Sequence, residues 1–202
     1  MNKTPTDDEL DSVLLVELPG IRWTADDAQA ARNRVITIPL DIVTAVDREE
    51  TWVYAAIGNS ARQGEIALSE ETLIRGLIGG TPNQHTPVRI RSLLRINALG
   101  SAELGLAQKW HYVAETDILD HAEHEFNQWF DKEHLPLLAA IPGTQQARRY
   151  KSNGSPRYFT CYDLETRETH GNAQWRAAAS TPWRNKMHES FLNSRRTMFT
   201  RI

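Results

Sequence analysis

The sequence predicts an α+β protein built from two successive β-α-β-β-α-β units. Strand-like apolar runs and amphipathic helical segments follow one another in this order through the first half of the chain, and the same order returns in the second half. The two halves are similar in length, and each is about the size of one ferredoxin-like unit. They share no strong residue identity, so we infer the repeat from the order of the elements.

The first half spans residues 12–104 and follows a polar lead-in at 1–11 that we expect to be disordered. Thr24 precedes a segment with acidic residues in its first turn, which is typical of a residue that caps a helix. The segment LDIVTAV is strand-like within an otherwise ambiguous stretch. The other expected elements are strands at 12–18, 51–58 and 87–99, a helix at 24–35, and a second helix that begins at Ser69.

The second half spans residues 105–202 and begins near a glycine-containing junction. The Asn153-Gly154 dipeptide is a strong signal for a tight hairpin turn. Pro182 is expected to interrupt the last helix, because proline lacks the N–H that a helix interior requires. The expected elements are strands at 108–116, 144–151, 156–165 and 195–202, and helices at 121–140 and 172–191.

Each unit would form a four-stranded sheet with helices on one face, which leaves the opposite face apolar and uncovered. Packing these two faces against each other buries both. The predicted fold class is therefore α+β, with two tandem ferredoxin-like units packed sheet to sheet as an intrachain α+β barrel. Two separate small domains are the alternative. A chain that supplies both halves of the barrel can be a monomer, and any homo-oligomer would use the outer helices.

Composition narrows the partners and the location. The 202 residues are 40% hydrophobic and 24% charged, with a formal net charge of −3, which argues against nucleic acid or an anionic membrane as the main partner. No apolar run approaches the ~20 residues that cross a bilayer. The polar N-terminus lacks a signal-peptide pattern and the single cysteine, Cys161, fits a reducing compartment, so we expect a cytoplasmic protein.

The stretch EFNQWFDKEHLPLLAAIPGTQQARRY carries the strongest functional signal. In a helix, Phe126, Phe130 and His134 would lie along one face, and Asp131 would lie on the neighbouring row within reach of the imidazole. Pro136 is expected to kink the helix or end it. A histidine at the edge of an apolar face is more often a packed or helix-capping group than a catalyst, and the residues alone leave both interpretations open.

A spaced set of residues in this stretch comprises Phe126, Trp129, Asp131, His134, Leu135, Pro136, Pro142, Gly143 and Tyr150. In this order and spacing the set resembles the EthD-like branch of the dimeric α+β barrel superfamily, and the resemblance covers roughly residues 108–202. The first half lacks the W-x-x-x-x-H-x-P signature. The resemblance implies a pocket between sheet and helix, in a family that includes polyketide cyclases, lactone isomerases, dehydratases and accessory proteins of xenobiotic degradation.

We expect His134 to be catalytic, with Asp131 orienting the imidazole or stabilising its charged form. Each expected binding residue also has a structural interpretation: the aromatic side chains would be core, Arg148 would lie at a solvated strand edge or hold an oxyanion, and His188 would lie exposed on a helix. The expected substrate-binding residues are Trp129, Phe130, Arg148, Tyr150, Tyr162 and His188.

Two classes of function remain open. The first is a cofactor-independent lyase or isomerase (of the cyclase, dehydratase or lactone-isomerase type) that acts on a small aromatic or polyketide-like compound with His134 as proton shuttle. The second is a non-catalytic binding or accessory protein of a catabolic pathway that holds a small hydrophobic or aromatic molecule. The sequence contains no phosphate-binding or dinucleotide motif, and His121 and His124 have neither the usual spacing nor a third ligand for zinc, so we expect no metal and no cofactor. A haem-linked barrel has no support in the sequence.

Overall fold

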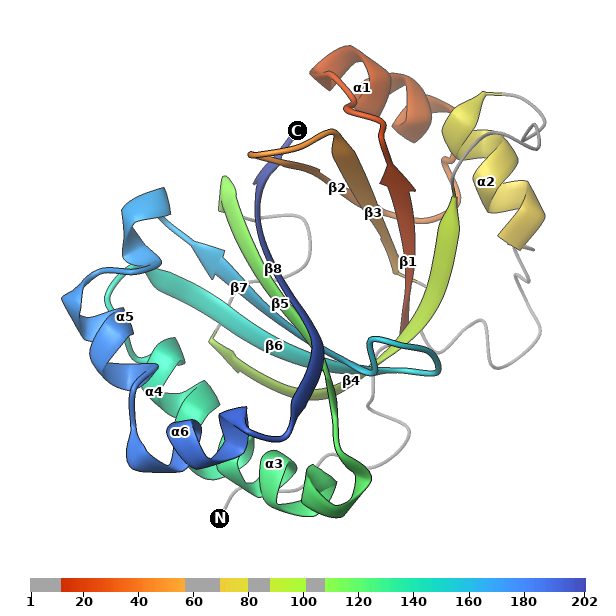
Figure 1. The fold of residues 1–202 in the computed structure, drawn as a ribbon. Coiled ribbons are helices and arrows are strands. Elements are labelled where there is room, and N and C mark those ends of the chain that lie inside the picture. The colour runs from red at the N-terminus through yellow and green to blue at the C-terminus, as the bar shows by residue number, and fades with distance from the viewer. Residues whose placement is uncertain (1–11, 57–69, 80–87, 101–107) are drawn as a thin grey trace. The chain divides into compact units, whose positions relative to one another are not determined.

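The computed structural model describes residues 12–56, 70–79, 88–100 and 108–202 (Figure 1). The chain divides into two compact units, one up to Arg95 together with Ile202 and the other from Ile96 to Arg201. The expected lead-in at 1–11, the helix start at Ser69 and the expected boundary between residues 104 and 105 lie outside the described residues, so these expectations stay predictions.

The first unit contains the predicted β-α-β-β-α-β order. Its elements are β1 (Ser12–Pro19), α1 (Ala25–Arg34), β2 (Leu40–Ala45), β3 (Glu50–Ala56), α2 (Glu70–Ile78) and β4 (Arg89–Gly100), whose last residues, from Ile96 on, belong to the second unit. β1 pairs with both β3 and β4, and β2 pairs with β3, all antiparallel, so the strand order is β4-β1-β3-β2. This is the strand order of a ferredoxin-like unit.

Local chemistry explains where α1 begins. Thr24 accepts a hydrogen bond from the Asp27 N–H at 3.2 Å, and the Asp27 carboxylate accepts one from the Thr24 N–H at 2.8 Å. This capping box satisfies two donors that the helix start would otherwise leave unpaired, as the position of Thr24 in the sequence predicted. The core of the unit lies between the sheet and both helices, where Ala28 of α1 and Leu73 of α2 are fully buried.

The second unit repeats the order. Its elements are β5 (Trp110–Ile118), α3 (Glu123–Trp129), α4 (Leu135–Ala139), β6 (Thr144–Ser152), β7 (Tyr158–Leu164), α5 (Ala173–Ala178), α6 (Pro182–His188) and β8 (Phe191–Arg201). β5 pairs with β7 and β8, and β6 pairs with β7, so the strand order β8-β5-β7-β6 matches that of the first unit. Figure 1 shows α3 to α6 gathered on one side of this sheet.

The predicted helix at 121–140 differs from expectation at its centre. A π-helical turn at Phe130–His134 separates α3 from α4, and the Leu135 N–H bonds to the Phe130 carbonyl, one residue further back than in an α-helix. Pro136 falls in the first turn of α4, where a missing N–H costs little. The expectation that Pro136 would end the helix was therefore wrong, and the chain stays helical to Ala139.

The last helical segment is interrupted where the sequence predicted. α5 ends at Ala178, and Pro182 occupies the first position of α6 behind the N-cap residue Thr181. β8 begins at Phe191, four residues earlier than expected. This earlier start places Ser194 on the strand, where its hydroxyl lies 2.8 Å from that of Thr116 on β5.

Strand alternation divides the second unit into two chemical faces. On β7, Tyr162 belongs to the apolar core under the helices, whereas Asp163 lies on the opposite face. On β6, the Arg149 guanidinium lies over aromatic rings of the helical layer, whereas Arg148 bonds to Asp163 at 2.5 Å. Adjacent residues of a strand therefore lie on opposite faces of the sheet, and only one of these faces is covered by the helices.

Candidate functional site

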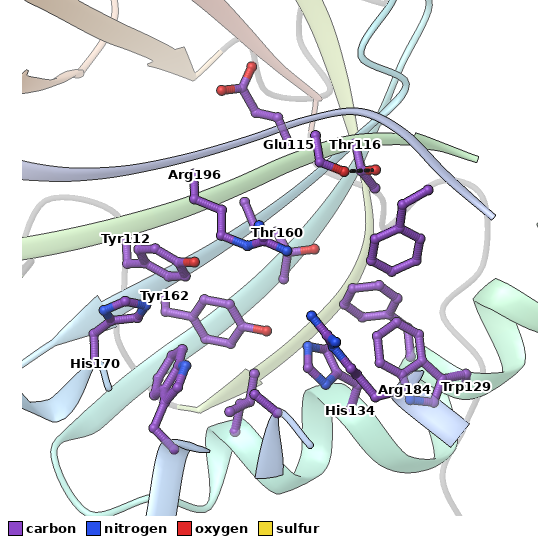
Figure 2. Close-up of a pocket in the computed structure, with 17 residues that line it drawn as sticks. Tyr112, Glu115, Thr116, Trp129, His134, Thr160, Tyr162, His170, Arg184 and Arg196 are labelled. Atoms are coloured by element: carbon purple, nitrogen blue, oxygen red, sulfur yellow. Dashed lines mark hydrogen bonds between the residues drawn. The ribbon is translucent and has the colours of Figure 1, made fainter. Parts of the chain in front are cut away.

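A cavity of about 220 Å³ lies between the helices and the sheet of the second unit. Its walls are mostly aromatic, and a smaller set of polar side chains reaches into it from α6, β7 and β8 (Figure 2). Such a mixture is typical of a site for a small organic molecule. The aromatic rings that line it are those of Tyr112, Trp129, Phe130, Tyr162, Trp175 and Phe191.

His134 borders this cavity at the end of the π-helical turn. Its imidazole stacks on Trp129, with ring centroids 4.3 Å apart and an angle of 27°, and meets Phe130 edge to face at 5.0 Å. Its Nδ1 is buried and has no hydrogen-bond partner within the described part of the chain. A buried polar atom without a partner is costly, so this nitrogen is a candidate contact for a ligand.

The surroundings of His134 keep its imidazole neutral. Burial lowers the pKa of His134, and the positive charges of Arg184, Arg149 and Arg196 lower it further, from 6.5 to about 3. At neutral pH the side chain can therefore accept a proton or a hydrogen bond and carries no charge of its own.

Two arginines reach the cavity from different elements. Arg184 comes from α6 and Arg196 from β8, and Figure 2 shows both beside the same space as His134. Burial and the charge of Arg196 lower the pKa of Arg184. Neither guanidinium has a carboxylate partner among the residues that the structure describes. Both guanidinium groups therefore contribute positive charge to the cavity.

Two tyrosine hydroxyls add hydrogen-bond donors. In Figure 2 the hydroxyls of Tyr112 and Tyr162 point toward the space that Arg196 enters. Burial raises the pKa of Tyr112 to about 12 and raises the pKa of Tyr162 as well, so both stay protonated at neutral pH. The Tyr162 hydroxyl is buried and, among the described residues, has no hydrogen-bond partner. It is therefore available to a ligand oxygen.

The structure brings together four of the residues that the sequence singled out. His134, Trp129, Phe130 and Tyr162 all line the cavity. Trp129 also anchors its own helix, because its indole N–H bonds to Glu133 at 3.1 Å.

Asp131 lies apart from the imidazole, contrary to expectation. Its carboxylate accepts hydrogen bonds from Asn97 at 2.8 Å and from Arg149 at 3.4 Å, and the side chain is half exposed. The expected reach assumed an α-helix, in which residues three apart lie close together. The π-helical turn contains more residues per turn, so Asp131 and His134 leave that alignment.

Three expected binding residues lie outside the cavity lining. Arg148 and Tyr150 occupy the opposite face of β6, where Arg148 is bonded to Asp163. The adjacent Arg149 faces the helices instead. His188 is exposed and contacts the cavity indirectly, through Phe191 at a ring distance of 5.6 Å.

Arg149 supports the wall of the cavity from behind. Its guanidinium lies 4.0 Å from the ring centre of Phe130 and donates to Asn127 at 2.9 Å. Burial lowers the pKa of Arg149 to about 10, so it remains charged. The sequence showed that Arg148 and Arg149 point to opposite faces, but it contained no signal for which of them faces the helices.

The cavity residues that the sequence did not identify include Tyr112, His170, Arg184 and Arg196. His170 stacks against Tyr112 with ring centroids 4.0 Å apart, and burial and Arg196 lower its pKa. Period-two alternation on β5 and β8 places Tyr112 and Arg196 on one face, but no local pattern shows that this face borders a cavity.

A second hollow, of about 410 Å³, lies in the first unit at the end of α1 and beside α2. It is an open surface feature, and its arginine side chains already form hydrogen bonds or ion pairs with neighbouring residues. Arg34 donates to the carbonyls of Gly76 at 2.7 Å and Leu77 at 2.8 Å, and Arg75 pairs with Glu71 at 2.6 Å. We therefore take the cavity at His134 as the candidate site.

The described residues contain no cluster of three or more His, Cys, Asp or Glu side chains placed to hold a metal ion. None of their helices combines the length and hydrophobicity that crossing a membrane requires.

No protein-family model matches the sequence, and no curated protein matches it significantly. Solved structures do resemble it. An anthrone oxidase-like protein superposes with a TM-score of 0.64 at 10% identity, over 95% of this chain and 91% of that one. A monooxygenase-like protein from Listeria innocua superposes with a TM-score of 0.55 at 11% sequence identity, over 95% of this chain and 94% of that one. The heme-degrading enzyme LmHde from Listeria monocytogenes superposes with a TM-score of 0.54 at 7% sequence identity, over 94% of this chain and 98% of that one.

At these identities the likeness shows the fold alone. The chain shares an α+β fold with these structures and contains two ferredoxin-like units in tandem, as the order of elements predicted, which agrees with the resemblance to the dimeric α+β barrel superfamily. The narrower resemblance to the EthD-like branch stays a prediction.

Proposed function

We propose that the second unit is a cofactor-independent lyase or isomerase that moves a proton on a small aromatic or polyketide-like molecule. The observation that carries this proposal is a neutral, partly buried imidazole beside a cavity lined with aromatic rings and cations, whose buried Nδ1 has no hydrogen-bond partner among the described residues. The similar solved structures include a monooxygenase-like protein and a heme-degrading enzyme, which supports small-molecule chemistry as one use of this fold.

In this mechanism His134 is the general base. An imidazole lone pair takes a proton from an acidic carbon of the substrate, which leaves an imidazolium and an enolate. The Tyr162 hydroxyl and the Arg196 guanidinium are placed to stabilise the enolate oxygen. The imidazolium then returns the proton to another carbon, which completes an isomerisation, or to a leaving hydroxyl, which releases water. Neither course needs an oxidant.

The lowered pKa of His134 makes it a weak base, and this observation favours a second candidate function. With a pKa of about 3, His134 accepts protons poorly until a ligand changes its surroundings. A non-catalytic protein that binds or delivers a small aromatic molecule would use the same walls and cations without any proton transfer.

The cavity does not fit haem. Its 220 Å³ lie below the ~300 Å³ at which pockets for drug-sized ligands begin, and a tetrapyrrole is larger than such ligands. A histidine that binds iron usually has its other ring nitrogen oriented by a hydrogen bond, whereas Nδ1 of His134 has no partner in the described chain. We therefore assign no step to haem.

Deuterium exchange tests the proposal directly. The protein is incubated in D₂O with small aromatic ketones and lactones that contain an acidic carbon, including benzofuran-2(3H)-one, and incorporation is followed by NMR. Wild type should accelerate exchange, His134→Phe should abolish the acceleration, and His121→Phe, at an exposed position, should retain it. Ligands that bind without any exchange would favour the binding function instead.

Assembly and location remain proposals as well. We expect a monomer, or a homo-oligomer that uses the outer helices, in the cytoplasm. Multi-angle light scattering tests the assembly, and fractionation of the producing cells tests the location.

A further inference from the structure

The cavity contains an excess of positive charge that its own residues do not balance. Arg184 and Arg196 enter it without a carboxylate partner within the described residues. Glu115 is a lining residue, but its carboxylate is bonded to Arg195 at 2.6 Å, and Figure 2 shows it pointing away from the other side chains. With His134 neutral, neither guanidinium is paired with a carboxylate in the described part of the chain.

Arg196 is exposed to solvent, whereas Arg184 is partly buried. Burial and the charge of Arg196 both disfavour the charged form of Arg184. Two polar groups beside them, Nδ1 of His134 and the Tyr162 hydroxyl, are buried and have no hydrogen-bond partner in the described chain. A single anionic ligand would provide both the missing charge and a hydrogen-bond acceptor for the hydroxyl.

We propose that the cavity binds the anion of a small aromatic acid, with its carboxylate or phenolate oxygens between Arg184 and Arg196 and its ring inside the aromatic walls. The proposal rests on the function proposed above and names the ligand class for the same site. A volume of about 220 Å³ limits the ligand to about one or two rings.

Such an anion would also act on His134. Charges face the imidazole from three elements, with Arg184 on α6, Arg196 on β8 and Arg149 on β6. The tyrosine hydroxyls of β5 and β7 face the same space and are neutral, and Trp129 and Phe130 cover the imidazole with uncharged rings. A bound negative charge offsets the arginines and so raises the pKa of His134. The imidazole thus becomes a stronger base when a negatively charged ligand is bound. The site therefore favours anionic substrates for the proton transfer.

The test compares benzoate with benzamide by isothermal titration calorimetry at pH 7. The two probes have nearly the same shape and differ in charge, and neither contains an acidic carbon on which His134 could act. We expect benzamide to bind roughly 10- to 100-fold more weakly, as for the loss of a charged hydrogen bond. Arg184→Gln and Arg196→Gln should each weaken benzoate by a similar factor.

Arg176→Gln is the matched control, because Arg176 is exposed on α5, outside the cavity lining, and the change removes the same charge. It should alter benzoate affinity less than twofold. Thermal melts check that all variants fold. NMR titration of the His134 ring, with and without benzoate, should show a higher midpoint in the bound form.

Three results would overturn the proposal: equal binding of both probes, no binding of benzoate, or equal losses in Arg176→Gln and the two cavity variants. These results are separable from failure of the proposed function. Benzoate binding as described, with no deuterium exchange on any carbon acid, leaves the anion site standing and removes the proton transfer. Deuterium exchange on carbon acids, together with equal binding of benzoate and benzamide, would leave the proton transfer standing and remove the anion site.

Discussion

His134→Phe should remove a pH dependence of stability that the wild-type protein carries. The pKa of His134 is lowered from 6.5 to about 3 on folding, chiefly by burial and then by three arginines. Between these values the unfolded chain binds a proton that the folded chain does not, so the wild type loses stability as the pH falls below 6.5. At 1.36 kcal/mol per pH unit, the loss from this one group reaches roughly 2 kcal/mol at pH 5.

Phenylalanine keeps an aromatic ring against Trp129 and removes the unpartnered nitrogen. We therefore expect the variant to lie within about 1 kcal/mol of wild type at pH 7, since relief of the buried polar atom and the larger ring oppose each other. At pH 5 the free energy of unfolding of the variant, relative to that of wild type, should be higher than at pH 7 by roughly 2 kcal/mol. Other histidines contribute equally to both proteins and cancel in this difference.

Urea denaturation at pH 7, 6 and 5, followed by tryptophan fluorescence, measures the shift. Trp129 and Trp175 line the cavity and report on this unit. His121→Phe, at an exposed position, shows what removal of any imidazole does to the pH dependence. Parallel curves for wild type and His134→Phe would refute the reasoning, because they would mean that the native imidazole is solvated or already protonated.

Three further substitutions test packing and buried charge by urea denaturation. Phe126→Ala removes a fully buried ring from the core of the second unit and should cost about 3–5 kcal/mol, whereas a loss below about 1 kcal/mol would show a loosely packed core. Gly143→Ala, at a φ of +91°, places a Cβ 2.6 Å from the Thr169 hydroxyl and should cost about 1–3 kcal/mol; an unchanged midpoint would contradict the tight turn. Asp163→Asn removes the buried carboxylate that pairs with Arg148 at 2.5 Å and should cost about 3–5 kcal/mol, and an equally stable variant would show that the ion pair contributes little.

The sequence by itself determined the order of the elements and several of their ends. The capping residue Thr24 and the break before Pro182 follow from backbone chemistry within a few residues, so no knowledge of distant contacts was needed. The placement of Trp129, Phe130 and His134 on one segment was predictable for the same reason. The repeated element order was enough to predict tandem ferredoxin-like units.

The tertiary structure decided which polar residues meet at the cavity. Alternation showed that Arg148 and Arg149 point to opposite faces of their strand, but the helices that define an inner and an outer face pack from elsewhere in the chain. Arg184 and Arg196 converge because α6 lies over the sheet that contains β8. The π-helical turn, which separates Asp131 from His134, follows no periodicity that the residues show. Local propensity thus determines where elements begin and end, whereas the cavity, its charge and the neutral state of His134 depend on long-range packing that excludes water.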